Sequence, residues 1–545
     1  MPSVAMDEPP PLALVNGRVL RTVPGRRDPH RASTALLVED GKIARIGDDR
    51  AVLGALGRRG DDIDLRGRVV APGFVDAHIH AFDCAMASRK VSCLPPAVGG
   101  LVDLKRRLTE RARSISAGEW VIGEGYDDMR LAERRHPTRQ DLDEAVPAHP
   151  TVVKRVCGHM SVANSRALAI AGIDEHTGDP PGGVIVRDGA GHATGLLLEE
   201  AQDLVLRASP PIDGKEIARA LVRMGRTLLA HGVTTIGEAL LGAFHPNEPE
   251  IWSEVLSGGW TGPRVRFLAD PRIMTDGSGT GLPIIGTKLF ADGVVTGQTA
   301  AVSRPFEGDG GSGMLIHEPD ALAALVEASV TRGLPVGIHA MGDRAIDVAI
   351  DAIERAERVV AAPLQQLPTR RPDGRHRIEH CTLPSSRALQ RMWSLGIVPV
   401  PQPVFLFAEG EAYKARLGAP RSASAYPLRT MIRRGLRPAL SSDAPATSSE
   451  DAADPWLGIR AAVTRRTWAG SELGTEEAIS VFEAMVGYTA SGAFALSLED
   501  VTGSIDVGKA ADLIVLPDDP LFIQPQELYP LRPEFVLLRG RMHPV

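Results

Sequence analysis

Two histidines separated by one residue end an apolar run near the start of the chain. The run "GFVDAHIH" extends from Gly73 to His80 and is typical of a buried strand. Residues two apart on a strand face the same side, so His78 and His80 should point the same way. Imidazoles on one face predict half of a metal site. The alternative is two unrelated histidines, so the other half must come from elsewhere in the chain.

Other potential ligands end later strand-like runs. Lys288 lies in "TKLFADG", His339 in "VGIHAMGD", His380 in "HRIEHC" and Asp443 in "LSSDAP", while "VPVPQP" contributes only Gln402. Taken singly, each has a plain structural interpretation: a core or capped histidine, a surface lysine, or a turn or helix-capping aspartate. Taken together, ligand-type residues recur at the ends of successive strands, and this joint pattern favours a metal centre.

The elements that position these residues alternate between strand and helix. Amphipathic stretches such as "GKEIARALVRMGRTLLAHG" separate short apolar runs, which predicts a parallel α/β fold. Eight runs suit a (β/α)8 barrel, in which catalytic residues lie at the carboxyl ends of the strands. The runs are "VVAPGFVDAHIH", "VTTIGEA", "RVRFLAD", "GTKLFADG", "PVGIHAMG", "RHRIEHC", "GIVPVPQP" and "RPALSSDAP". Two more, "WVIGEGY" and "TVVKRVCGH", fall between the first and second and predict an insert of about residues 101–206.

Both ends of the chain are rich in short strands and turns. "VNG" and "EDGK" mark turns between short strand-like runs near the start. Near the end, "GSIDVGKAADLIVLP" and "PEFVLLRGRMHPV" show the same pattern of short strand-like runs and turn residues. We expect residues 1–70 and 497–545 to form one β-sandwich domain and residues 71–496 to form the barrel. Two independent β units are the alternative, and each would have a poor core.

Composition excludes several classes of partner and location. The 545-residue chain has a net charge of -7, with 43% hydrophobic and 24% charged residues, so neither nucleic acid nor an acidic membrane surface is expected as a partner. Its 4 cysteines form no CxxC pair, which argues against disulfides and thiolate zinc sites. We see no signal peptide and no apolar stretch of the ~20 residues that span a bilayer, and we expect a cytoplasmic protein.

The ordered motifs resemble the amidohydrolase superfamily, and within it amidohydrolase family 3, which includes enzymes like N-substituted formamide deformylase. The resemblance covers nearly the whole chain. It rests on "APGFVDAHIH", "CGHMSVANSRAL", "PPGGVIVRD", "HGVTTIGEA", "KLFADG", "IHAMGDRAID", "RIEHC", "SSDAP", "AAVTRRT" and "GSIDVGKAADLIVL". After "FADG" the chain departs from the usual loop, with Phe306 near the place where related sequences often carry Tyr.

The resemblance implies a barrel with a flanking β-sandwich and two divalent metal ions. His78 and His80 match the ligands of the more buried ion, and His339 and His380 match those of the more exposed ion. Lys288 matches a carboxylated lysine that bridges both. Zn²⁺ is the expected metal, with Mn²⁺, Fe²⁺ or Ni²⁺ as alternatives. Asp443 matches an aspartate that binds metal and handles protons.

These residue types suit hydrolysis. Imidazole and carboxylate bind Zn²⁺ and similar ions. A buried lysine beside metal ions has a lowered pKa, so its neutral amine reacts with carbon dioxide to form a bridging carbamate. Metal-bound water ionises near pH ~7. Asp443 would take a proton from this nucleophile and deliver it to the leaving amine.

The insert and loops supply expected substrate contacts. Tyr126 and His159 are predicted to contact substrate or an oxyanion, with catalytic roles, and Asp127, Gln402 and Phe306 are predicted to line the substrate site. In "GHMSVANS" the alternative is the start of a helix capped by Ser or Asn.

We therefore expect a hydrolase of non-peptide C–N bonds that acts on a small N-acyl or N-formyl amine and forms a homodimer. A deaminase with one metal ion, or a cyclic amidase, of the same superfamily is the alternative. A barrel that binds without catalysis is a further alternative, and the complete ligand set argues against it.

Overall fold

The computed structural model divides into two compact units. It describes the chain except residues 1–9, 26–32, 88–89, 96, 129, 157–159, 181–182, 211–212, 275–280, 309–310, 362–374, 448, 450 and 545. The first unit comprises Met1–His80, Val222–Asp443 and Ala453–Val545, and the second comprises Ala81–Leu221 and Ala444–Ala452.

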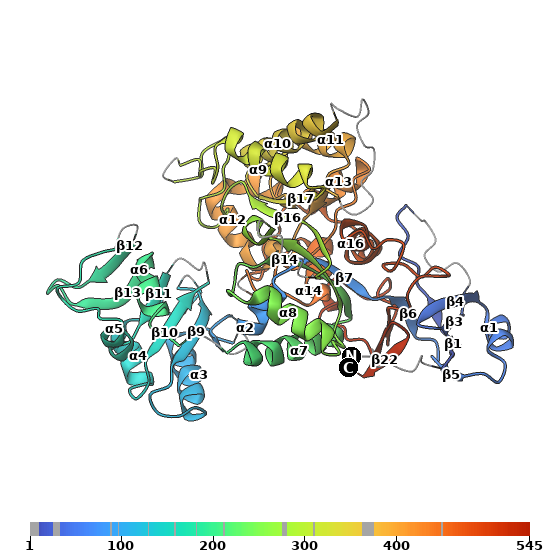
Figure 1. The fold of residues 1–545 in the computed structure, drawn as a ribbon, viewed down its shortest axis with the longest axis horizontal. Helices are drawn as coiled ribbons and strands as arrows, with labels where there is room; N and C mark the ends of the chain where they lie inside the picture. The colour runs from blue at the N-terminus through green and yellow to red at the C-terminus, as the bar shows by residue number, and fades with distance from the viewer. Residues whose placement is uncertain are drawn as a thin grey trace. The chain divides into compact units, whose positions relative to one another are not determined.

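A sheet of seven parallel strands is the centre of the first unit (Figure 1). Its strands are neighbours in the order in which the chain forms them, as βα units require. Most of their residues are buried, which is typical of a parallel sheet covered on both faces. They are β7 (Phe74–Ile79), β14 (Val233–Leu241), β15 (Arg264–Ala269), β16 (Ile284–Phe290), β17 (Val336–Ala340), β18 (Arg377–His380) and β19 (Val398–Val400).

Helices connect these strands. The expected amphipathic stretch forms α7 (Gly214–Ala230), which begins in the second unit and ends in the first, and α9 (Pro319–Thr331) lies between β16 and β17. The other helices of this unit are α1 (Asp49–Leu56), α8 (Glu248–Ser257), α10 (Asp343–Ala361), α11 (Ser386–Leu395), α12 (Val404–Ala423), α13 (Leu428–Arg433), α14 (Pro455–Thr464), α15 (Val481–Val486) and α16 (Gly492–Ala495). The predicted α/β barrel architecture is confirmed.

The eighth run, "RPALSSDAP", was expected to be a strand but is extended chain outside the sheet ladder. The Ala439 amide donates to the Pro399 carbonyl at 3.0 Å, and the Asp443 amide donates to the His78 carbonyl at 2.8 Å. The segment therefore lies against both edges of the sheet and nearly closes it. Pro438 lacks an amide hydrogen and Asp443 has a φ of 54°, so a regular ladder cannot continue.

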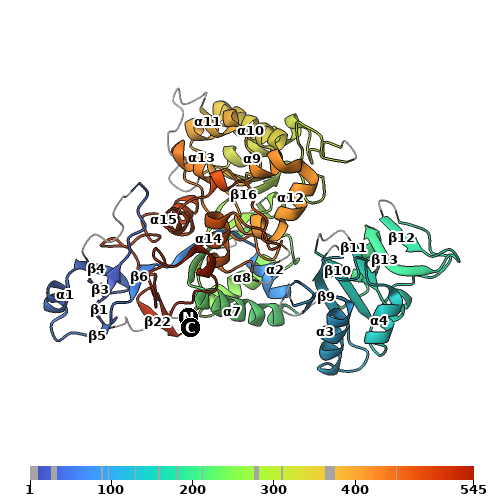
Figure 2. The same cartoon turned by 180° about the vertical axis from the view of Figure 1, so that it is seen from behind.

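Strands from both ends of the chain form the sandwich. One sheet has the order β4-β3-β1-β5 and the other β2-β6-β20-β21-β22, and both views place β1, β3 and β4 beside β6 (Figures 1 and 2). Because β6 pairs with β20, the alternative of two independent β units is wrong. The strands are β1 (Leu12–Val15), β2 (Arg18–Val19), β3 (Ala35–Glu39), β4 (Lys42–Gly47), β5 (Asp61–Asp64), β6 (Val69–Pro72), β20 (Leu513–Leu516), β21 (Phe535–Leu538) and β22 (Arg541–Pro544).

The run "VVAPGFVDAHIH", expected as one strand, contains two. It breaks at Gly73, between β6 of the sandwich and β7 of the barrel. A Cβ on Gly73 would lie 2.2 Å from the Thr234 hydroxyl oxygen, so only glycine permits this close approach of β7 and β14.

The second unit has its own six-stranded sheet, ordered β12-β13-β11-β10-β9-β8. The two extra apolar runs form β9 and β10 there, outside the barrel sheet, as expected. Its strands are β8 (Val91–Ser92), β9 (Val121–Tyr126), β10 (Thr151–Arg155), β11 (Met160–Ala163), β12 (Gly183–Arg187) and β13 (Ala193–Glu199). Its helices are α2 (Ala81–Ala87), α3 (Leu101–Arg113), α4 (Arg139–Ala145), α5 (Ser165–Ile170) and α6 (Ala201–Leu206).

Within the part of the chain that the structure describes, no helix combines the length and apolar character needed to cross a membrane.

Gly237 holds β14 close to the strand that carries the first histidines. A Cβ there would lie 2.4 Å from the Ala77 carbonyl oxygen, a backbone atom. We expect Gly237→Ala to lower the free energy of unfolding by about 1–3 kcal/mol, because β7 and β14 must separate. Equilibrium unfolding in denaturant measures this change in the free energy of unfolding. Gly54→Ala is the control: it has open space in α1 and should raise stability by ~0.5–1 kcal/mol. Equal effects at the two positions would contradict the close packing.

Candidate metal centre

The polar side chains at the carboxyl ends of the barrel strands come together inside the first unit. His78 lies on β7, with His80 just beyond it, and Lys288, His339 and His380 lie on β16, β17 and β18. His78, Lys288, His339 and His380 are at most 8% exposed, so the interpretation of Lys288 as a surface lysine is wrong. The structure therefore places all five in a buried region at the end of the barrel where catalytic groups gather.

The imidazole rings pack against one another. The ring centroids of His78 and His80 are 5.4 Å apart, those of His78 and His380 are 5.2 Å apart, and those of His339 and His380 are 4.3 Å apart. Lys288 Nζ lies 3.4 Å from His78 Nε2. Four side chains on strands and His80, the residue after β7, thus bring five nitrogen-bearing groups into one small volume.

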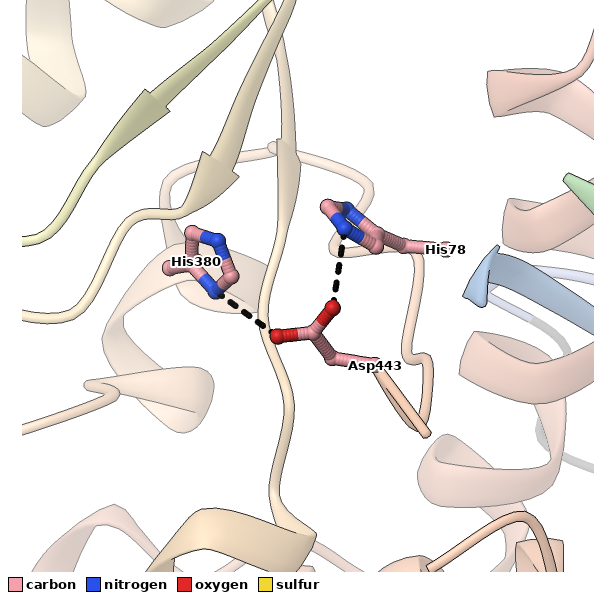
Figure 3. A group of neighbouring side chains, drawn as sticks. All are labelled: His78, His380 and Asp443. Atoms are coloured by element: carbon pink, nitrogen blue, oxygen red, sulfur yellow. Dashed lines mark ion pairs between the residues drawn. The ribbon is translucent and has the colours of Figure 1, made fainter. Parts of the chain in front are cut away.

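Asp443 supplies the carboxylate of this cluster. Its Oδ1 lies 3.1 Å from His78 Nε2 and 3.1 Å from His80 Nε2. Its Oδ2 lies 3.8 Å from His380 Nδ1, and the three residues point toward one another in Figure 3. One potential ligand atom from each of His78, His380 and Asp443 lies within 4.8 Å of the others. The carboxylate is therefore in reach of imidazoles from both sides.

The backbone around Asp443 is strained and tightly held. Asp443 has a φ of 54°, in the left-handed region that aspartate rarely adopts. Asp76 accepts hydrogen bonds from the Ser442 amide, at 3.0 Å, and from the Ser442 hydroxyl. Asp76 therefore fixes the residue next to Asp443.

A π-helix supports the same segment from behind. It comprises Gly487–Ser491. The Leu440 amide donates to the Gly487 carbonyl at 3.2 Å, and the Tyr488 hydroxyl donates to the Ser441 carbonyl at 3.1 Å. Such single-turn insertions are often found at functional sites. Here it supplies the hydrogen bonds that a missing ladder would have made.

Glu379 orients His78. His78 Nδ1 lies 2.5 Å from Glu379 Oε2, so in the neutral ring this nitrogen carries the hydrogen and Nε2 presents its lone pair. Arg377 donates to both Glu379 oxygens, at 2.7 and 2.8 Å. Burial raises the pKa of Glu379, but the positive charge of Arg377, together with the hydrogen bonds from Arg377 and His78, outweighs it and holds the pKa well below its usual range.

Gln402 orients His380 in a similar way. Gln402 Oε1 lies 2.9 Å from His380 Nδ1, and its amide nitrogen donates to Val400 O and Ser441 Oγ. The residue is 0% exposed. The structure thus gives Gln402, predicted to contact substrate, a positioning contact with His380, because its polar atoms are already occupied by the protein.

A left-handed backbone brings His380 into the cluster. Arg377 and Glu379 share one face of β18 and reach toward His78, so regular alternation would turn His380 away. His380 has a φ of 65° and Cys381 a φ of 47°, which breaks the alternation at the strand end. Two consecutive side chains can therefore face the same interior space.

Asp292 joins the loops around His339. Its carboxylate accepts from the Ala301, Met341 and Gly342 amides, at 2.8, 3.0 and 2.8 Å. Its Oδ1 lies 3.7 Å from His339 Nε2, which is 3.0 Å from the Gly293 carbonyl. Burial raises the pKa of Asp292 to about 7, against these hydrogen bonds.

Burial sets the charge state of the nitrogens. It lowers the pKa of His80 and His380, and together with the nearby Lys288 it lowers that of His339 to about 4. Burial also lowers the pKa of Lys288, against the attraction of Glu379 and Asp443. Neutral nitrogens are the form that binds metal ions.

Two of the remaining predicted residues belong to the second unit. Tyr126 is buried in the core of the second unit, with its hydroxyl 3.0 Å from His136 Nδ1, and Asp127 Oδ1 lies 3.4 Å from Arg155 Nη2. His159 lies outside the described residues. Phe306 is 3% exposed, in the loop after β16.

The capping hypothesis for "GHMSVANS" holds for one residue. Asn164 caps α5 by accepting from the Ala167 amide. Ser161 does not cap the helix, because it lies within β11.

Sequence reasoning missed three supporting residues: Arg377, Glu379 and Asp292. The alternation in "RIEH" placed Arg377 and Glu379 on one buried face, and a buried Arg–Glu pair at a strand end was the available signal. Nothing in "ADG" distinguished Asp292 from a turn aspartate.

Comparisons with known proteins agree with this geometry. Residues 61–543 match the model of the amidohydrolase family. The chain is 31% identical over 543 residues to an N-substituted formamide deformylase of Arthrobacter pascens, with 96% of each protein covered.

Two solved structures are similar over nearly their whole length. An uncharacterized metal-dependent hydrolase from Pyrococcus horikoshii superposes with a TM-score of 0.75 and 25% identity, covering 95% of this chain and 99% of that one. Its counterpart from Pyrococcus furiosus gives 0.73 and 26%, covering 94% and 100%. Since the family match spans most of the chain, the protein belongs to the amidohydrolase family and is a metal-dependent hydrolase acting on carbon–nitrogen bonds.

Proposed function

We propose that this hydrolase cleaves the amide bond of an N-acyl or N-formyl amine at the cluster around Asp443. The observation that carries the proposal is the approach of His78 Nε2 to Asp443 Oδ1 at 3.1 Å. Because His78 Nδ1 carries the hydrogen shared with Glu379, Nε2 presents a lone pair to a carboxylate oxygen. Two electron-rich atoms in a buried space repel each other unless a proton or a metal ion lies between them.

The donor set fits divalent metal ions. Two ligand atoms about 2.0–2.1 Å from one ion are roughly 3.0–3.4 Å apart, and both histidine nitrogens lie at such a distance from Asp443 Oδ1. That oxygen is buried, and its polar contacts among the described residues are with these two imidazole nitrogens. Two metal ions, Zn²⁺ first and Mn²⁺, Fe²⁺ or Ni²⁺ as alternatives, suit these ligands. The proposed ligands are His78, His80, Lys288, His339, His380 and Asp443.

Lys288 is proposed to act as a bridging ligand after carboxylation. An ammonium cannot bind a cation, but the buried amine lies 3.4 Å from His78 Nε2 and therefore beside the proposed ions. Reaction of the neutral amine with carbon dioxide forms a carbamate and releases a proton. The carbamate oxygens would then face the same space as Asp443.

Bound metal ions supply two things: a water with a pKa lowered to ~7 and polarisation of the substrate carbonyl. The protein supplies the proton transfer. Asp443 takes a proton from the attacking water and delivers it to the amine nitrogen as the C–N bond breaks, so the products are a carboxylic acid and an amine. Glu379 and Gln402 keep His78 and His380 in fixed orientations throughout.

The substrate class rests on the relative that is named an N-substituted formamide deformylase. Substrate contacts by Tyr126, Asp127, His159 and Phe306, and assembly into a homodimer, remain part of the proposal.

A second candidate is a deaminase or cyclic amidase that uses one metal ion. It is favoured by the compact group of His78, His380 and Asp443, which is sufficient for one ion without Lys288. The state of Lys288 distinguishes the two candidates.

The chain loaded with Zn²⁺ or Mn²⁺ is expected to release amine from an N-formyl or N-acyl amine. Asp443→Asn should keep the fold and the metal but lower kcat about 10²–10⁴-fold, because proton transfer is lost. Product release by chromatography and metal content by mass spectrometry measure both effects. Asp62→Asn, at an exposed position on β5, is the control. Failure of the metal-loaded chain on N-acyl, N-formyl and cyclic amides alike would refute the function.

Lys288 is expected to carry a carbamate in the metal-loaded protein. Incubation with ¹³C-bicarbonate should give one carbamate ¹³C NMR signal that is absent from Lys288→Met, because the methionine has no amine. A partly exposed lysine such as Lys414, which pairs with Glu411, should add no stable signal, and Lys414→Met is the control. A metal-loaded protein without the signal would favour the candidate with one ion.

Glu379→Gln is expected to weaken metal binding about 10–100-fold, because Gln cannot hold the His78 ring with a charge-assisted hydrogen bond. Competition with a fluorescent chelator measures the affinity. Glu354→Gln removes a carboxylate from an arginine pair on the exposed side of α10 and serves as the matched control. An unchanged affinity in Glu379→Gln would show that the ring is oriented by other contacts.

A further inference from the structure

A hollow lined by basic residues lies at the opposite end of the barrel from the metal centre. Arg264 is the first residue of β15, and ligands of the metal centre lie at the carboxyl ends of the strands. A cavity of about 410 Å³ there is lined by Asp40, Gly41, Lys42, Arg264, Asp500, Val501, Gly508, Ala510, Arg539 and Arg541. An adjoining cavity of about 450 Å³ shares Arg264, Val501 and Arg539 and adds Arg266.

From this hollow we infer a binding site for a small multivalent oxyanion, one that carries phosphate or carboxylate groups. The site is distinct from the proposed substrate site and does not depend on the proposed function.

Two tight turns shape the hollow. Asp40 and Gly41, between β3 and β4, have φ of 51° and 71°, and Arg539 and Gly540, between β21 and β22, have φ of 53° and 74°. The turns pack against each other so closely that a Cβ on Gly41 would lie 2.8 Å from the Arg539 carbonyl oxygen. Positive φ at both central residues marks rigid hairpin turns. These two packed turns form a rigid frame, so the backbone positions of the side chains on them are fixed.

Asp512 ties this frame to the barrel. It is 2% exposed. Its carboxylate accepts from Arg264 Nε at 2.7 Å and from the Arg539 backbone amide at 2.8 Å. The Asp512 carboxylate is thus engaged by Arg264 and by the turn.

The cations of the hollow outnumber its carboxylates. Five basic residues, namely Lys42, Arg264, Arg266, Arg539 and Arg541, line the two cavities. Against them stand Asp40 and Asp500 in the lining and Asp512 behind Arg264. The whole chain has a net charge of -7, so this local excess of positive charge differs from the rest of the protein. Such a concentration of positive charge attracts anions.

Two arginines account for the excess of positive charge in the hollow. Among the described residues, neither Arg266 nor Arg539 has an ion pair or a side-chain hydrogen bond to a protein group. Burial, and then the charge of the neighbouring Arg264, lower the pKa of both guanidinium groups, although the charge of Asp512 partly opposes this at Arg539. A bound anion would relieve that repulsion.

The chemistry of guanidinium selects the ligand. Its planar fork of donors matches the paired oxygens of carboxylate and phosphate, and such charge-assisted hydrogen bonds are short and strong. Arg266, two residues after Arg264 on β15, faces the same side of the strand, while Arg539 approaches from the turn. Donors from two directions suit an anion with more than one charged group.

The test measures binding of inorganic pyrophosphate and of citrate to the metal-loaded full chain by calorimetry, with chloride adjusted to equal ionic strength. We expect saturable binding of at least one of the two. Arg266→Gln and Arg539→Asn should each weaken it about tenfold or more, because each removes a charged donor. Asparagine tolerates the left-handed conformation at position 539. Arg433→Gln, at an exposed position on α13, is the control and should leave binding unchanged.

Each result decides the proposal. Binding of pyrophosphate alone supports a phosphate ligand, binding of citrate alone supports a polycarboxylate, and binding of both supports the shared oxyanion chemistry. Binding of neither overturns the site. Binding that survives both substitutions arises at the metal ions or at general surface charge and also overturns it. If Arg266→Gln fails to fold, Arg539→Asn decides alone, since its side chain extends from a surface turn.

Discussion

The approach of Asp443 Oδ1 to two imidazole nitrogens, at 3.1 Å each, is the constraint around which the first unit is organised. Groups that would repel one another in a dry interior are brought together and held there. Surrounding hydrogen bonds stabilise this arrangement: Glu379 binds His78, Gln402 binds His380, and Asp76 binds the residue beside Asp443. In the proposed metal centre, a bound ion would resolve the repulsion, and the protein would keep the ligands in place for it.

That organisation also explains the irregular backbone. His380 and Asp443 are both left-handed, and a π-helix stands behind Asp443. Each departure places a side chain where regular geometry would not. Strain of order 1–3 kcal/mol at each position persists because neighbouring strands and hydrogen bonds determine the conformation. At the opposite end of the barrel, Arg266 on β15 and Arg539 on a hairpin turn have no ion pair among the described residues.

Much of the fold followed from the sequence. Seven of the expected barrel strands form one parallel sheet, and the two extra apolar runs form strands outside it. Periodicity identified these elements because buried parallel strands are short continuous apolar runs. However, periodicity predicted regular strands at both edges of the sheet where the structure has irregular backbone. "VVAPGFVDAHIH" divides at Gly73, and "RPALSSDAP" is extended chain, since proline and a left-handed aspartate interrupt a ladder in ways that hydrophobic pattern does not record.

The residue types and their positions at strand ends were determined by the sequence itself, because a strand's period of two fixes which side chains share a face. That was enough to group His78, His80, Lys288, His339, His380 and Asp443. Only the tertiary structure decided how they are held. Glu379 reaches His78 across 301 positions of the chain, and Gln402, expected at the substrate, packs on His380 instead. Such contacts join separate strands through space, and no local pattern encodes the distance between them.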